Sequence, residues 1–181
     1  MDEGLKRRNR LQLVALFGIA GLTLAGASAL FYGARSGGVW GTVNHGEFVQ
    51  PALTLAELQL EDSEGQVLST GETWWLWVVA RESCDSGCAD AVLQLRQLHV
   101  LLAKDAARVQ RGLVTQQGSP APGVLAEFPK LRHLQGNLEA LKTGVYVVDP
   151  IGNLVFWYPL ADAGKPVLED LKRLLKLSQI G

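Results

Sequence analysis

Residues 74–88 read W-W-L-W-V-V-A-R-E-S-C-D-S-G-C, and this stretch decides the fold. Its first seven residues, Trp74–Ala80, form a continuous run of aromatic, β-branched and other apolar side chains. A short run of this kind favours a strand that is buried on both faces of a sheet. Helical periodicity follows over residues 89–107. The two cysteines, Cys84 and Cys88, therefore lie where a buried strand ends and a helix begins.

The rest of the C-terminal half predicts an alternation of strands and helices. Further strands are expected at residues 58–60, 109–115, 145–148 and 154–158; residues 125–141 are expected to be helical in pieces, and a last helix is expected from Pro166 to about residue 179. The order ends with a hairpin and one helix. This order predicts an α/β, thioredoxin-like fold.

The N-terminal part has the pattern of a membrane anchor. Residues 11–34 carry no charged side chain, and this run exceeds the ~20 apolar residues that are needed to cross a bilayer. Basic residues precede the run at Lys6, Arg7, Arg8 and Arg10. Since flanking positive charge stays in the cytoplasm, the remainder of the chain should be exported.

A cleavable signal peptide is the alternative for the same segment. Ala27-Ser28-Ala29 matches the small-x-small cleavage pattern. The apolar run is longer than the 7–15 residues of a typical signal core, which favours a retained transmembrane helix.

Composition limits the classes of partner. The chain has 48% apolar and 19% charged residues and a net charge of −1. It therefore lacks the basic field that nucleic-acid binding needs, and we expect no nucleic-acid partner.

The two cysteines leave three interpretations open. Positions i and i+4 of a helix face the same way, and the start of a helix favours the thiolate. Cys84 and Cys88 are then a structural disulfide, a redox pair, or a site for a soft metal ion such as Cu(I). A bridge that closes so short a loop should stabilise the chain by only ~2 kcal/mol.

Two other stretches carry open alternatives. Asn44-His45-Gly46-Glu47 is either a partner-contact motif or part of a flexible tether. Along residues 155–158, V-F-W-Y, alternate side chains face opposite sides of the strand. One pair must therefore point outward or be covered by another element.

The strand, C-x-x-x-C, long helix and the stretch V-Y-V-V-D-P-I-G-N-L together resemble the Sco/SenC family of copper chaperones. The resemblance spans about residues 58–179. Residues 60–67, L-E-D-S-E-G-Q-V, are similar to that family's opening hairpin. By overall pattern the chain resembles the small membrane-anchored type associated with bacterial cytochrome c oxidase assembly.

The resemblance implies a site and a set of partners. Cys84 and Cys88 match the family's metal-binding cysteines, so they are the expected copper ligands or redox residues. The family's histidine ligand corresponds here to Lys142-Thr143-Gly144, so the third ligand is unidentified. His133 would complete the site only if its loop folds over the cysteines. The implied partner is a cytochrome c oxidase subunit or another assembly factor.

The sequence as a whole predicts four segments. These are a cytoplasmic basic N-terminus (1–10), a transmembrane helix (11–34), a linker with the start of the domain (35–57), and a thioredoxin-like periplasmic domain (58–181). The implied location is the bacterial inner membrane, crossed once.

The leading hypothesis is an assembly factor for a haem–copper oxidase that handles copper or thiols through its C-x-x-x-C pair. One alternative is a thiol–disulfide oxidoreductase for oxidase cysteines. The other is a non-catalytic scaffold with a structural disulfide, so whether the chain is an enzyme stays open.

Overall fold

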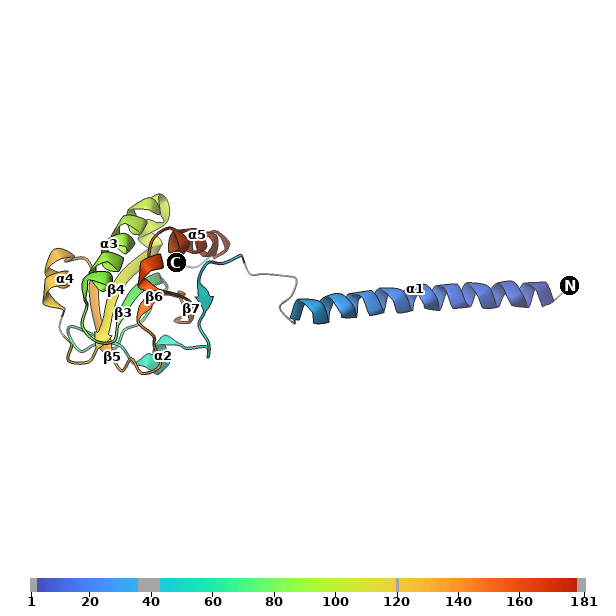
Figure 1. Cartoon of the computed structure of the whole chain (residues 1–181), viewed down its shortest axis with the longest axis horizontal. Coiled ribbons are helices and arrows are strands. Elements are labelled where there is room, and N and C mark those ends of the chain that lie inside the picture. Colours follow the sequence, from blue (N-terminus) through green and yellow to red (C-terminus); the bar gives the residue numbers. More distant parts are fainter. Residues whose placement is uncertain (1–2, 36–42, 120, 179–181) are drawn as a thin grey trace. The chain divides into compact units, whose positions relative to one another are not determined.

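The computed structural model describes residues 3–35, 43–119 and 121–178. The chain divides into two compact units, Met1–Val43 and Asn44–Gly181. The first unit contains the long helix α1 (Glu3–Arg35), and the described strands all belong to the second (Figure 1).

A seven-stranded mixed sheet forms the middle of the second unit, in the order β1-β7-β6-β3-β4-β5-β2. The strands are β1 (Glu47–Phe48), β2 (Glu61–Asp62), β3 (Trp74–Ala80), β4 (Val109–Gln116), β5 (Arg132–Gly136), β6 (Gly144–Val148) and β7 (Leu154–Tyr158). β3 is parallel to β4 and antiparallel to β6. It is therefore the central strand, as its apolar run predicts.

Helices cover both faces of this sheet. They are α2 (Leu55–Leu58), α3 (Ser86–Leu101), α4 (Pro122–Glu127) and α5 (Lys165–Leu177), with short 3-10 turns η1 (Ala103–Arg108) and η2 (Leu160–Asp162). Helices α3 and α5 share one apolar cluster, and α2 belongs to the other. In Figure 1, α3 and α5 accordingly lie toward the top of the domain and α2 at the bottom.

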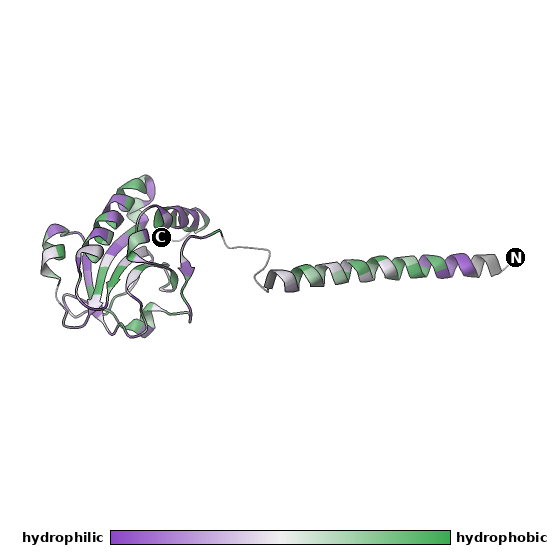
Figure 2. Cartoon of the chain, in the orientation of Figure 1, coloured by the Kyte–Doolittle hydropathy of each residue, from purple (hydrophilic) through white to green (hydrophobic). Residues whose placement is uncertain are grey.

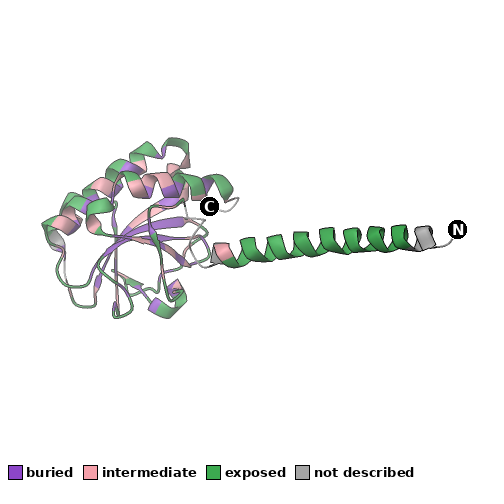
Figure 3. Ribbon diagram, turned by 45° about the vertical axis from the view of Figure 1, so that its right-hand side comes forward, coloured by how far each residue is buried: buried purple, intermediate pink, exposed green. Residues whose placement is uncertain are grey.

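All seven residues of β3 are buried. Leu76 and Val78 face the cluster beneath α3 and α5, while Trp75 and Trp77 face the cluster beneath α2. Each of the two tryptophans is at most 1% exposed. Figure 3 shows the same buried sheet between more exposed helices. The central strand thus joins two hydrophobic cores, and its end fixes where the cysteine loop starts.

Two stretches differ from the sequence-based expectation. Residues 58–60 are expected to be a strand, but Leu58 is the last residue of helix α2. This helix is capped at its start, where the Glu57 carboxylate accepts the Thr54 N–H at 2.8 Å. Residues 125–141 were expected to be helical in pieces, yet they contain strand β5. Leu134 is the single apolar residue of β5, so the sequence of β5 has no alternation of apolar and polar residues that would indicate a strand. The strand is defined by its parallel pairing with β4.

Residues 45 and 46 are docked on helix α5. The carboxylate oxygen Oδ2 of Asp170 accepts the N–H groups of His45 at 2.7 Å and Gly46 at 3.0 Å. It also accepts the hydroxyl of Tyr158 at 2.9 Å. Burial, and then the neighbouring Asp170 carboxylate, raise the pKa of Tyr158, which keeps this hydroxyl a donor. These residues are therefore part of the domain and not of a flexible tether.

Helix α1 is long and apolar enough to cross a bilayer over Arg7–Gly33. Figure 2 shows its apolar length after a hydrophilic stretch near the N-terminus, and Figure 3 shows it exposed over most of its length, with an intermediate segment at its C-terminal end. An exposed apolar helix of this length fits a membrane anchor or a signal sequence.

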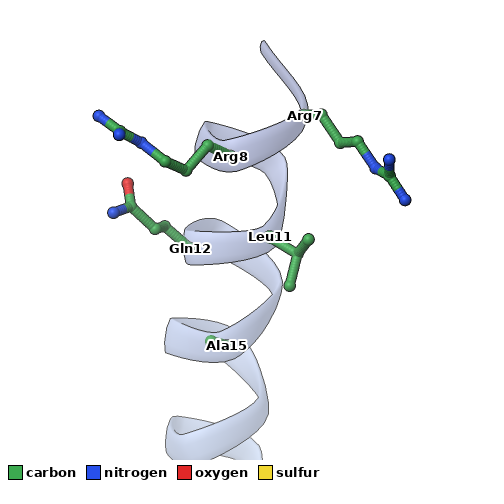
Figure 4. A pocket seen from close by; sticks show the side chains of 5 residues that line it. All are labelled: Arg7, Arg8, Leu11, Gln12 and Ala15. Atoms are coloured by element: carbon green, nitrogen blue, oxygen red, sulfur yellow. The ribbon is translucent and has the colours of Figure 1, made fainter. Parts of the chain in front are cut away.

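The boundary between the basic and the apolar parts of α1 is visible in Figure 4. Arg7 and Arg8 project to different sides of the helix, and Leu11, Gln12 and Ala15 follow in the next turns. The shallow hollow that these five residues line is built from α1 alone.

We predict that Asp170→Asn lowers the free energy of unfolding by about 2 kcal/mol, because three donors lose a charged acceptor that is only 2% exposed. The measurement is urea unfolding of the full chain in detergent, followed by tryptophan fluorescence.

Glu169→Gln is the matched control for Asp170→Asn. It removes two exposed contacts of Glu169, one of 2.8 Å to the His45 ring and one of 3.7 Å to Lys165, and should change stability by less than about 1 kcal/mol. Equal losses in the two variants would contradict the buried-carboxylate account.

Candidate functional site

Cys84 and Cys88 form a disulfide, with their Cα atoms 5.1 Å apart. Cys84 lies in the loop after β3 and is half-buried, whereas Cys88 lies in the first turn of α3 and is 1% exposed. Cys84 is therefore the more exposed residue of the pair, and Cys88 is packed in the core beneath α3.

Asp85 positions the second cysteine by capping the helix. Its carboxylate oxygen Oδ1 accepts the N–H of Cys88 at 3.0 Å, and its carbonyl accepts the N–H of Ala89 at 2.9 Å. Because an aspartate at this position satisfies a free N–H of the first turn, α3 starts at Ser86. That is three residues earlier than the apolar periodicity alone predicts.

An open cleft of about 820 Å³ lies beside the disulfide. The end of β3, the loop after it and the first turn of α3 contribute residues 80–83, Asp85 and Cys88 to its lining. Other elements contribute Gln116, Glu139, Lys142, Thr143 and Leu160. The cleft is therefore built from the ends of the neighbouring strands β3 and β4, the start of α3, the turn η2 and the segment that leads into β6.

Trp157 fixes the segment before β6. Its indole Nε1 donates to the Thr143 carbonyl at 3.3 Å, and the Lys142 Nζ atom lies 5.3 Å from its ring centroid. Gly144 leaves the room for this indole, since an added Cβ would collide with Trp157 and with the Tyr158 carbonyl. In β7, Trp157 thus lies on the opposite face of the sheet from Phe156 and Tyr158. Neighbouring groups cover its ring on that face.

His133 lies on β5, where its Nε2 atom is 2.9 Å from the Thr115 hydroxyl. That hydroxyl donates to the Ser119 carbonyl, so the histidine nitrogen is the donor in the pair. Burial lowers the pKa of His133. His99 bonds two backbone carbonyls, of Ala106 and Val109, and has a packing role.

The residues around the disulfide do not form the three-ligand copper site that the family resemblance implies. Among the described residues, no group of three or more His, Cys, Asp or Glu side chains is placed to hold a metal ion. The two sulfurs are bonded to each other, so neither is a thiolate ligand in this state. The role of His133 as a third ligand stays a prediction.

Residues 74–178 match a family described as a transmembrane-like, thioredoxin-like, C-terminal domain. The match covers more than half of the 181 residues. The chain belongs to this family. Membership confirms the predicted α/β thioredoxin-like fold, here preceded by one long apolar helix. Comparison with curated protein sequences gives no match.

Solved structures share the fold of this transmembrane-like, thioredoxin-like domain at low identity. A thiol:disulfide interchange protein from Bacteroides sp. is 13% identical, with a TM-score of 0.50, over 76% of this chain and 95% of its own. Peroxiredoxin Q from Xanthomonas campestris is 14% identical, with a TM-score of 0.50, over 71% and 99%. Copper-bound ScoI from Bradyrhizobium japonicum is 19% identical, with a TM-score of 0.49, over 64% and 96%. At these identities the likeness concerns the fold alone.

Sequence reasoning found the cysteine pair but missed the residues that surround it. Asp85 could have been found, since an aspartate directly before a helix is a typical cap. The family resemblance assigns Lys142 to the position of the third ligand. Gln116 and Trp157 carry no such signal, because the topology brings Gln116 to the cleft and Trp157 to Lys142 from distant parts of the chain.

The lowered pKa of His133 predicts a pH dependence of stability. A histidine whose folded pKa lies below its unfolded value of about 6.5 binds protons preferentially in the unfolded chain. The free energy of unfolding should therefore keep its full value above about pH 6.5 and decrease as the pH drops below it. His133→Gln should reduce this loss between pH 7.5 and pH 5, measured by urea unfolding at each pH. Identical pH profiles for both proteins would refute the assignment.

Proposed function

We propose that the chain is a membrane-anchored thiol–disulfide exchange protein that acts through Cys84 and Cys88 outside the cytoplasmic membrane. The observation that carries the proposal is the asymmetry of the pair. Cys84 is partly exposed and is bonded to Cys88, which is 1% exposed and lines an open cleft at the end of the buried central strand.

This asymmetry assigns a role to each cysteine in exchange. A substrate thiolate attacks Sγ of Cys84, a mixed disulfide forms, and Cys88 leaves as a thiolate. A second substrate thiolate then attacks the substrate sulfur of the mixed disulfide and releases Cys84. The substrate gains a disulfide and this protein becomes a dithiol. The reverse sequence reduces a substrate disulfide, and the relative potentials decide the direction.

The proposed substrates are cysteines of a haem–copper oxidase, with a cytochrome c oxidase subunit or another assembly factor as the partner. The support is the Sco/SenC-like pattern of residues 58–179, together with the apolar helix α1 that fits a retained anchor. The proposed location is the bacterial inner membrane, with the N-terminus cytoplasmic and the C-terminal domain periplasmic.

Copper transfer is the second candidate. Its support is that the fold brings together two sulfur atoms from positions four residues apart, and paired thiolates select soft ions such as Cu(I). In this case copper would be the cargo of the reduced pair and not a resident cofactor.

The exchange proposal predicts different behaviour for the two single variants. Full-length Cys88→Ser, incubated with oxidised glutathione in detergent, should form a mixed disulfide through Cys84. Cys84→Ser should react at least about tenfold more slowly, because the thiol that remains is buried. Mass spectrometry of the intact protein measures both rates.

Equal rates for the two variants would contradict the assigned roles. Full biological function of a Cys84→Ala/Cys88→Ala double variant in oxidase assembly would instead support a scaffold with a static disulfide, and would exclude both exchange and copper transfer.

Copper transfer predicts that the reduced full-length protein binds one Cu(I) ion in competition with a chelator, and that the double-cysteine variant binds none. Absence of binding by the folded, reduced protein would remove copper transfer and leave exchange.

A further inference from the structure

Lys142 lies at the junction of two hollows beside the redox pair. It lines the cleft that Cys88 also lines. It also lines a smaller hollow of about 70 Å³, whose walls include Phe48, Tyr146 and Trp157. A ligand that enters the cleft beside Cys88 therefore meets the Lys142 side chain.

The backbone and the side chain of Lys142 are both held in place. Its N–H donates to the Tyr146 hydroxyl at 2.9 Å, and that hydroxyl donates to its carbonyl at 3.2 Å. Tyr146 is 2% exposed. The ammonium lies over the Trp157 ring, which is itself bonded to the Thr143 carbonyl. Such contacts are unusual for an exposed lysine, which ordinarily keeps its rotamer freedom.

The charge of Lys142 is not used inside the domain. None of the five ion pairs found among the described residues includes it. Arg81, Glu82 and Glu139, which line the same cleft, take part in none of these pairs either. The cleft lining carries the cations Arg81 and Lys142 and the carboxylates of Glu82, Asp85 and Glu139. Of the two cations, Lys142 is the one held against an aromatic ring.

We infer that Lys142, held on Trp157, is a specificity-determining residue that selects protein segments with a carboxylate close to the reacting cysteine. The inference rests on the proposed exchange function. An exposed ammonium–carboxylate contact contributes up to about 1 kcal/mol, which corresponds to a preference of about two- to fivefold in rate.

The test uses the reduced full-length protein in neutral detergent and two synthetic peptides. Both peptides carry one cysteine in a disulfide with pyridine-2-thiol, a leaving group that is uncharged when released. They differ in one residue near the cysteine, glutamate or lysine. The protein dithiol becomes a disulfide, and the peptide disulfide is reduced to the peptide thiol and pyridine-2-thiol, whose absorbance gives the rate.

The wild-type protein should react about threefold faster with the glutamate peptide at low salt. Lys142→Gln should abolish this preference, Lys142→Arg should keep it, and Lys142→Glu should reverse it. Lys130→Gln is the matched control, since Lys130 is exposed but lines neither hollow, and it should leave the preference unchanged. Added salt should weaken the preference, as expected for an exposed charge.

Three results would overturn the inference. A wild-type protein that reacts equally with both peptides has no carboxylate preference. An equal slowing of both peptides by Lys142→Gln would show a merely structural role. Exchange with neither peptide would refute the exchange function itself, and with it this inference.

Discussion

Burial of β3 on both faces is the constraint on which the rest of the domain depends. Trp75 and Trp77 fill one core while Leu76 and Val78 fill the other. A tryptophan side chain buries some 150–250 Å² of surface, so the strand is fixed in register and depth. Because β3 ends at Ala80, the loop with both cysteines must emerge at the same end of the sheet as the end of β4.

The same constraint produces the asymmetry of the cysteine pair. Helix α3 packs over one face of β3, so a residue in its first turn lies against the core, and Cys88 is buried there. Cys84 precedes the helix and stays partly exposed. The Asp85 cap sets the start of the helix between them. An accessible sulfur and a protected one therefore follow from the position of a single helix start.

The central strand, β4, β6, β7 and the last helix could be predicted from the sequence, because each carries a clear run or repeating pattern of apolar side chains. β5 could not, since R-H-L-Q-G contains one apolar residue and its strand conformation comes from pairing with β4. The docking of His45 and Gly46 also escaped prediction. It depends on Asp170, more than 120 residues away, which in the sequence is one of several acids on an amphipathic helix. The cysteines of the site were found from spacing, and Lys142 through the family resemblance. Trp157 was not found, because only the folded sheet brings it to Lys142.

The account depends on a disulfide that opens and closes reversibly. The most direct test is equilibration of the full-length protein with glutathione buffers of graded potential, followed by alkylation and mass spectrometry of the intact chain. The account predicts a reversible change between the disulfide and the dithiol within the range of known exchange proteins, between about −270 and −120 mV. A bond that stays oxidised below about −300 mV, as structural disulfides do, would contradict it.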